Sequence, residues 1–110
     1  MIKVEGTTII MTRGDTFRAK VGIDKANGEP YEPSVNDLIV FTCKKSYATE
    51  EILIQKEISP ISMVLEILPE DTKELKQPSS YVYDIQLTKE DGTVDTFIAN
   101  AQLRIIEEVG

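Results

Sequence analysis

The chain has 110 residues, of which 41% are hydrophobic and 28% charged, so residues 1–110 fit a single ordinary globular domain. Nineteen acidic residues against 12 basic ones give a formal net charge of −7, and such a surface repels nucleic acid and anionic membranes, so neither is expected as a partner. The absence of His and the presence of one Cys exclude His-dependent nucleophilic catalysis and the usual zinc sites.

The N-terminal quarter of the chain predicts two strands. Ile2–Thr12 contains the apolar run Thr8–Met11, which is expected to form the first strand, and Arg13–Asp15 breaks it. Hydrophobic and polar residues then alternate from Phe17 to Ile23, which predicts a second strand with one buried face. Lys25–Gly28 follows with the composition of a hairpin turn.

Three further strands are expected in the middle of the chain. Two prolines in Glu29–Pro33 place that connection at a sheet edge, because proline has no N–H to donate to a ladder. Leu38–Lys44 is apolar on both faces in its first half, which favours a central strand. Ile52–Ile58 and Ile61–Ile67 are the other two predicted strands, the second with clear alternation.

One short helical turn is expected at Pro69–Leu75. Proline suits the first helical position, and Glu70 and Asp71 carry negative charge where the helix dipole favours it. Leu68 stands where an N-capping side chain would be placed and has no oxygen to offer, so a weakly capped start is predicted.

The clearest pattern is a hairpin over Ser80–Glu107. The residues expected to share its buried face are Tyr81, Tyr83, Ile85 and Leu87 on the first arm, and Phe97, Ala99, Ala101, Leu103 and Ile105 on the second. Lys89–Gly92 lies between the arms as a tight turn, in which Gly92 can adopt a positive φ. Taken together, the elements predict an all-β fold: an immunoglobulin-like antiparallel β-sandwich of about seven strands with one short helical turn near Pro69–Leu75.

No catalytic, cofactor-binding or metal-binding residues are predicted. Cys43 shares the apolar face of its strand with Phe41, which favours a buried and unreactive thiol. The acidic residues gather at turns, as at Glu90 and Asp91, and none of these groups fits a calcium loop, so solvation of the turns explains them. The missing His also disfavours a metal-dependent hydrolase.

Two other sets of residues have both a structural and a functional interpretation. Arg13–Asp15 spells an integrin-binding tripeptide, but a turn made by Gly14 explains it better. Tyr81 and Tyr83 could form a sugar-stacking platform, but they share a face with Ile85 and Leu87, which favours a core role. Tyr31 and Tyr47 lie in polar segments and are better candidates for surface contacts.

The order of several motifs resembles a known family. These motifs are Thr12–Thr16, Asn27–Pro30, Phe41–Ser46, Leu68–Thr72 with Leu75, and Ser80–Leu87. Together they are similar to small β-sandwich proteins from the tail and baseplate genes of phages of Gram-positive bacteria, in particular to the N-terminal domain of the baseplate upper protein. The family's pattern has Thr where this chain has Leu68, and residues 1–110 themselves predict no coiled-coil or fibre region.

This resemblance implies a non-catalytic structural or assembly module of a phage or prophage virion that acts by protein–protein contact. The expected partners are other virion or tail proteins, or further copies of the chain. The expected location is the virion, after synthesis in the bacterial cytoplasm without a signal peptide. The alternative is a carbohydrate-binding or adhesive β-sandwich module, which requires exposed aromatic residues on one sheet face.

The contact surface is expected at a strand edge without protecting charges or prolines, or at an outward apolar face. Ile52–Ile54 is apolar at every position, and charge is found only at its flanks. Val82 and Ile98 are apolar at outward positions of the last hairpin and would form a patch if they lie on adjacent strands. Leu53, Val82 and Ile98 are therefore the candidate contact residues.

Overall fold

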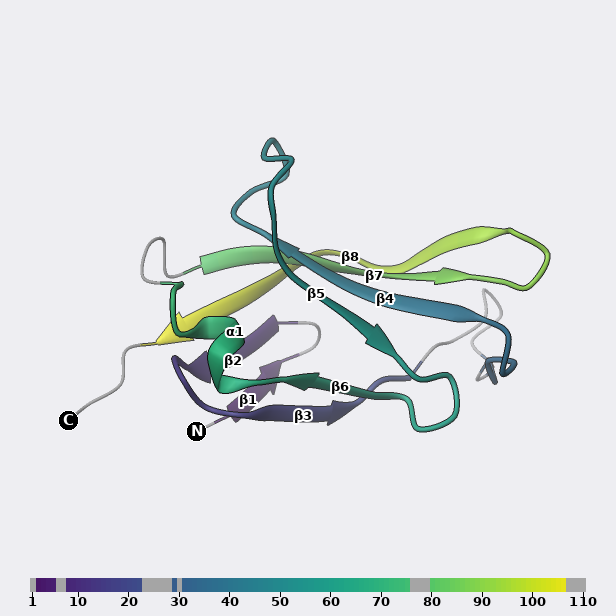
Figure 1. Cartoon of the computed structure of the whole chain (residues 1–110), viewed down its shortest axis with the longest axis horizontal. Coiled ribbons are helices and arrows are strands. Elements are labelled where there is room, and N and C mark those ends of the chain that lie inside the picture. The colour runs from purple at the N-terminus through teal and green to yellow at the C-terminus, as the bar shows by residue number, and fades with distance from the viewer. Residues whose placement is uncertain (1, 6–7, 23–28, 30, 76–79, 107–110) are drawn as a thin grey trace.

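The computed structural model describes residues 2–5, 8–22, 29, 31–75 and 80–106, and for residues 2–5 and 97–100 it describes the backbone only. The strands of this part of the chain are β1 (Ile2–Glu5), β2 (Thr8–Thr12), β3 (Phe17–Lys20), β4 (Leu38–Lys44), β5 (Ile52–Ile58), β6 (Val64–Ile67), β7 (Ser80–Thr88) and β8 (Val94–Ile106). They form a six-stranded sheet in the order β1-β2-β8-β7-β4-β5 and a two-stranded sheet of β3 and β6 (Figure 1). The predicted all-β, sandwich-like fold is confirmed.

The first predicted strand is in fact two strands. β1 and β2 pair antiparallel, with Ile2 opposite Met11, and β2 also pairs with β8 on its other side. The β2–β8 pair is parallel, with Ile9 opposite Leu103, whereas the other ladders are antiparallel. The sandwich is thus rich in antiparallel pairs without being wholly antiparallel.

The predicted strand at Ile61–Ile67 begins three residues later than expected. The Met63 N–H donates to the Ser59 carbonyl at 2.8 Å, which closes a turn ahead of β6. Met63 has a φ of 54°, a value that residues with a β-carbon seldom adopt, and Ile61 is left 79% exposed. The predicted turn at Lys25–Gly28 lies outside the described residues.

The core lies between the two sheets and follows the alternation of the strands. β4 and β7 pair with each other, and β5 lies on the other side of β4, so the central placement of Leu38–Lys44 is confirmed. The rings of Phe41 and Tyr83 pack with their centroids 5.0 Å apart. The buried side chains from these two strands are Ile39, Phe41, Cys43, Tyr81, Tyr83, Ile85 and Leu87.

The helical turn α1 (Pro69–Thr72) is shorter than predicted, although it starts at the expected proline. Leu68 supplies no side-chain cap, as expected, and its own N–H donates to Asp71 Oδ2 at 2.7 Å. The same Asp71 oxygen lies 2.8 Å from Lys56 Nζ, so one carboxylate holds the helix start against β5. Leu75 packs into the core just after the helix.

The predicted hairpin is present, with two register shifts in its second arm. The Lys89 N–H donates to the Thr93 carbonyl at 2.8 Å, and Gly92 has a φ of 93°, so the turn is confirmed. The buried positions Ala101, Leu103 and Ile105 are confirmed, and the side chains of Phe97 and Ala99 lie outside the description. The ladder shifts register on both sides of Ile85, so the predicted unbroken alternation of β8 is interrupted.

Candidate functional site

The outer face of the large sheet carries a group of polar side chains where β4 and β7 pair. Because Phe41 and Cys43 point into the core, Thr42 and Lys44 point away from it. The register places Thr42 opposite Asp84 and Lys44 opposite Val82. Two strands that are separate in the sequence thus bring a hydroxyl, an amine, a carboxylate and an apolar side chain together.

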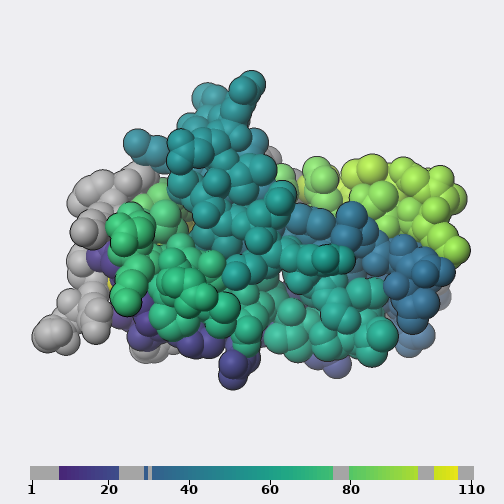
Figure 2. Space-filling model, in the orientation of Figure 1, coloured from purple at the N-terminus to yellow at the C-terminus, as the bar shows by residue number. Residues whose placement is uncertain are grey.

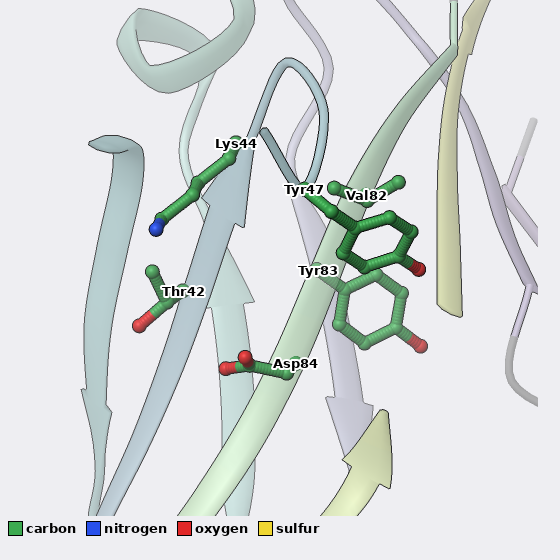
Figure 3. Close-up of a pocket in the computed structure, with 6 residues that line it drawn as sticks. All are labelled: Thr42, Lys44, Tyr47, Val82, Tyr83 and Asp84. Carbon is green, nitrogen blue, oxygen red and sulfur yellow. The ribbon is translucent and has the colours of Figure 1, made fainter. Parts of the chain in front are cut away.

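These residues line a hollow of about 240 Å³ that Tyr47 partly encloses. The connection between β4 and β5, which contains Tyr47, stands out from the body of the molecule (Figure 2). In the close-up, Lys44, Thr42 and Asp84 lie on one side of the hollow, with the Tyr47 ring on the other side near Val82 (Figure 3). The lining residues are Thr42, Lys44, Tyr47, Val82, Tyr83 and Asp84.

Lys44 and Asp84 are half-buried and have opposite charges. Neither side chain forms a hydrogen bond or ion pair with another described residue. They are diagonal neighbours across the β4–β7 ladder, an arrangement in which the β-carbons are typically about 7–8 Å apart. Both groups are therefore free to bind the same small ligand.

Leu53, the first predicted contact residue, is less available than expected. Cys43 faces Ile54 and Lys44 faces Ile52, so Leu53 is the extra residue of a bulge in β5. Its side chain is half-buried and packs against the core. The neighbouring Ile52 is 47% exposed on the face that carries Lys44, so Ile52 is the apolar side chain that this edge presents.

Val82 and Ile98, the other two predicted contact residues, are not paired by the hairpin. Their strands are adjacent, but Val82 faces Gln102 and Ile98 faces Ile85. Val82 lines the hollow, whereas the side chain of Ile98 lies outside the described residues. The register therefore gives no support to a single patch that contains both residues.

Tyr31 and Tyr47 have different surroundings, although both were expected at the surface. Tyr47 is 61% exposed, in agreement with the prediction. Tyr31 is half-buried, and its hydroxyl donates to Asp37 Oδ2 at 2.7 Å, so it presents less surface than Tyr47. This tyrosine helps to hold a buried carboxylate.

Asp37 is a buried polar residue that the sequence did not single out. Its carboxylate also accepts the Ser34 N–H at 2.9 Å and the Glu90 N–H at 3.2 Å. The hydrogen bond from Tyr31 and those from the two backbone amides hold the pKa of Asp37 below its usual value. Asp37 thus joins the segment before β4 to the β7–β8 turn, which is a structural role.

The Arg13–Asp15 turn also has a structural role. The Arg13 guanidinium donates to the Leu75 carbonyl from Nε at 3.0 Å, and its Nη2 donates to the same oxygen at 2.7 Å. Gly14 has a φ of 83°, and its N–H donates to the hydroxyl of the buried Thr72 at 2.9 Å. The interpretation of Gly14 as a turn residue is confirmed, and the turn holds α1 in place.

The described part of the chain offers neither a metal cluster nor a membrane-spanning helix. Within these residues no group of three or more Cys, Asp or Glu side chains is placed to hold a metal ion. None of their helices has the length and apolarity needed to cross a membrane.

Comparison with known proteins gives no assignment: no family model, no curated protein and no solved structure matches the chain.

Proposed function

We propose that this protein is a non-catalytic structural module of a phage or prophage virion, in the tail or baseplate region, and that it works by protein–protein contact. The phage assignment rests on the resemblance described above between this chain and small tail and baseplate proteins. The sandwich-like fold is compatible with that family, and a fold alone does not define a function.

The observation that carries the contact mechanism is the edge of β5. This strand pairs with β4 and is the last strand on its side of the large sheet, so no other described strand pairs with its outer backbone groups. Lys56 and Asp71 hold α1 near the middle of β5, which leaves the end around Ile52 as the open part. Exposed Ile52 supplies apolar area there, and a second copy of the chain is the proposed occupant.

Static light scattering over a concentration series tests this contact. We expect the wild type to self-associate and Ile52→Lys to shift it toward the monomer, because the lysine places a charge in the interface. Ile61→Lys is the matched control, since Ile61 is 79% exposed in the turn that follows β5, at the end of that strand opposite Ile52. A monomeric wild type, or equal effects of both substitutions, would contradict the contact.

The virion assignment is tested separately. We expect tail or baseplate genes beside the gene for this protein, and its peptides in purified phage particles analysed by mass spectrometry. Their absence from particles produced by the same genome would refute the assignment and would leave the result for the β5 edge unaffected.

A further inference from the structure

The hollow on the outer face of the large sheet has the size of a small ligand site. Its volume of about 240 Å³ lies just below the roughly 300–1,000 Å³ of sites for drug-sized ligands, so it suits one ring rather than a chain of rings. Its floor belongs to β4 and β7, whose ladder fixes the positions of Thr42 and Asp84. The polar groups are therefore held by a regular sheet, although Tyr47 comes from a loop.

The charges of the hollow favour a neutral ligand. Lys44 and Asp84 supply one positive and one negative group, so neither an anion nor a cation finds a site of uniformly opposite charge. The amine donates hydrogen bonds, the carboxylate accepts them, and the Thr42 hydroxyl can do both. A ligand that fits these groups carries several hydroxyls, each of which donates and accepts.

The exposed Tyr47 ring supplies an apolar surface beside those polar groups. With 61% of the side chain exposed, a ring face is open for contact, whereas Tyr81 and Tyr83 are buried in the core. An aromatic face attracts groups with positive partial charge, such as the C–H bonds on one face of a sugar ring. One aromatic face and a set of mixed hydrogen-bonding groups together match the two sides of a pyranose.

We infer that the hollow formed by Thr42, Lys44, Tyr47 and Asp84 binds a single neutral sugar residue. Asp84 accepts hydrogen bonds from two hydroxyls of the sugar, Lys44 donates to a hydroxyl or ring oxygen, and Tyr47 covers the apolar face. This inference does not depend on the virion assignment or on the β5 contact. It assigns a ligand to residues that those proposals do not use, although Lys44 faces Ile52 across the β4–β5 ladder.

The test is an NMR titration of the ¹⁵N-labelled wild-type protein with glucose, galactose and N-acetylglucosamine, and with glycerol phosphate as an anionic probe. We expect at least one neutral sugar to shift the amide signals of Lys44, Tyr47 and Asp84 in a saturable manner. Asp84→Asn and Tyr47→Ala should each weaken that binding roughly tenfold, the effect of losing one strong hydrogen bond or a stacking face.

Matched controls lie nearby. Lys45→Met and Asp95→Asn change exposed residues that do not line the hollow and should leave the binding constant unchanged, whereas Lys44→Met should weaken it. The wild-type titration locates the site even if a variant is unstable. Saturable shifts from glycerol phosphate alone, an absence of shifts from every sugar, or shifts confined to other residues would each overturn the assignment.

Discussion

At the residue scale, two tyrosine hydroxyls differ in what they contribute to stability. The Tyr81 side chain is 1% exposed, and its hydroxyl has no hydrogen-bond partner among the described residues, whereas the Tyr31 hydroxyl donates to Asp37. A buried polar group without a partner is destabilising, and its removal without a change of shape is tolerated. Relative to the wild type, we expect the denaturation midpoint of Tyr81→Phe to be unchanged or higher and that of Tyr31→Phe to be lower.

Urea denaturation followed by circular dichroism measures both midpoints. The two substitutions remove the same atom from the same type of residue, so each serves as the control for the other. A larger loss of stability in Tyr81→Phe than in Tyr31→Phe would show that the Tyr81 hydroxyl is hydrogen-bonded.

The thiol of Cys43 is expected to be unreactive in the folded protein. Its side chain is fully buried, and burial raises the pKa of the thiol to about 12, so the reactive thiolate is scarce at neutral pH. Labelling with a maleimide should be much slower in native buffer than in denaturant. Similar rates in the two solvents would be incompatible with this placement.

At the scale of an element, the β7–β8 turn depends on one glycine. Gly92 has a φ of 93°, and the space around its α-carbon is open, so a side chain there is opposed by backbone strain rather than by a clash. Gly92→Ala should cost about 1–2 kcal/mol of unfolding free energy. Gly22 also has open space but no positive φ, so Gly22→Ala is the matched control and should cost nothing.

Chemical denaturation of the two variants separates backbone strain from simple loss of a glycine. Equal stabilities would mean that the turn does not require a positive φ at position 92.

How far the sequence predicts each element depends on how local its determinants are. Leu38–Lys44 and Ser80–Thr88 each have a regular buried face, and β4 and β7 have the predicted bounds or nearly so. The bulge that turns Leu53 toward the core arises from its register with β4, and local composition carries no sign of it. The two-stranded sheet could not be predicted from local sequence either, because β3 and β6 pair across more than forty residues.

The candidate site shows the same limit. Val82 was found as an outward apolar residue, but the grouping of Lys44, Asp84 and Tyr47 comes from cross-strand pairing and a loop that stands over it. In the sequence, Asp37 is likewise an ordinary loop residue. Its structural role depends on the fold, which places the Glu90 N–H beside its carboxylate. No short motif links positions so far apart in the chain.

At the scale of the whole molecule, Asp37 should make the stability of the fold depend on pH in the acidic range. Hydrogen bonds hold its pKa below the ordinary value of 3.8, so the unfolded chain takes up the proton first as the pH falls. The contribution of Asp37 is therefore complete well above pH 3.8 and is lost as the pH falls through the lower pKa of the folded state. Asp37→Asn should be destabilised at pH 7 and should approach the wild type at low pH.

Thermal unfolding of wild type and Asp37→Asn between pH 7 and pH 2.5 provides the comparison. The pKa of Asp91 is also lowered, chiefly by the Thr93 backbone amide, but Asp91 is present in both proteins and cancels in the difference. A difference in melting temperature that stays constant over this range would show that the ionisation of Asp37 does not contribute to stability.

The parallel pairing of β2 with β8 has a consequence for the time course of synthesis. Ile9 and Leu103 are 94 residues apart (103 − 9), and at roughly 5–20 residues per second a ribosome needs about 5–20 s to make the intervening chain. Through that interval β1 can cover one edge of β2, while the other edge has no strand to join. The sequence Thr8-Ile-Ile-Met-Thr12 has no charge or proline to protect it, so the nascent chain is most exposed to aggregation there.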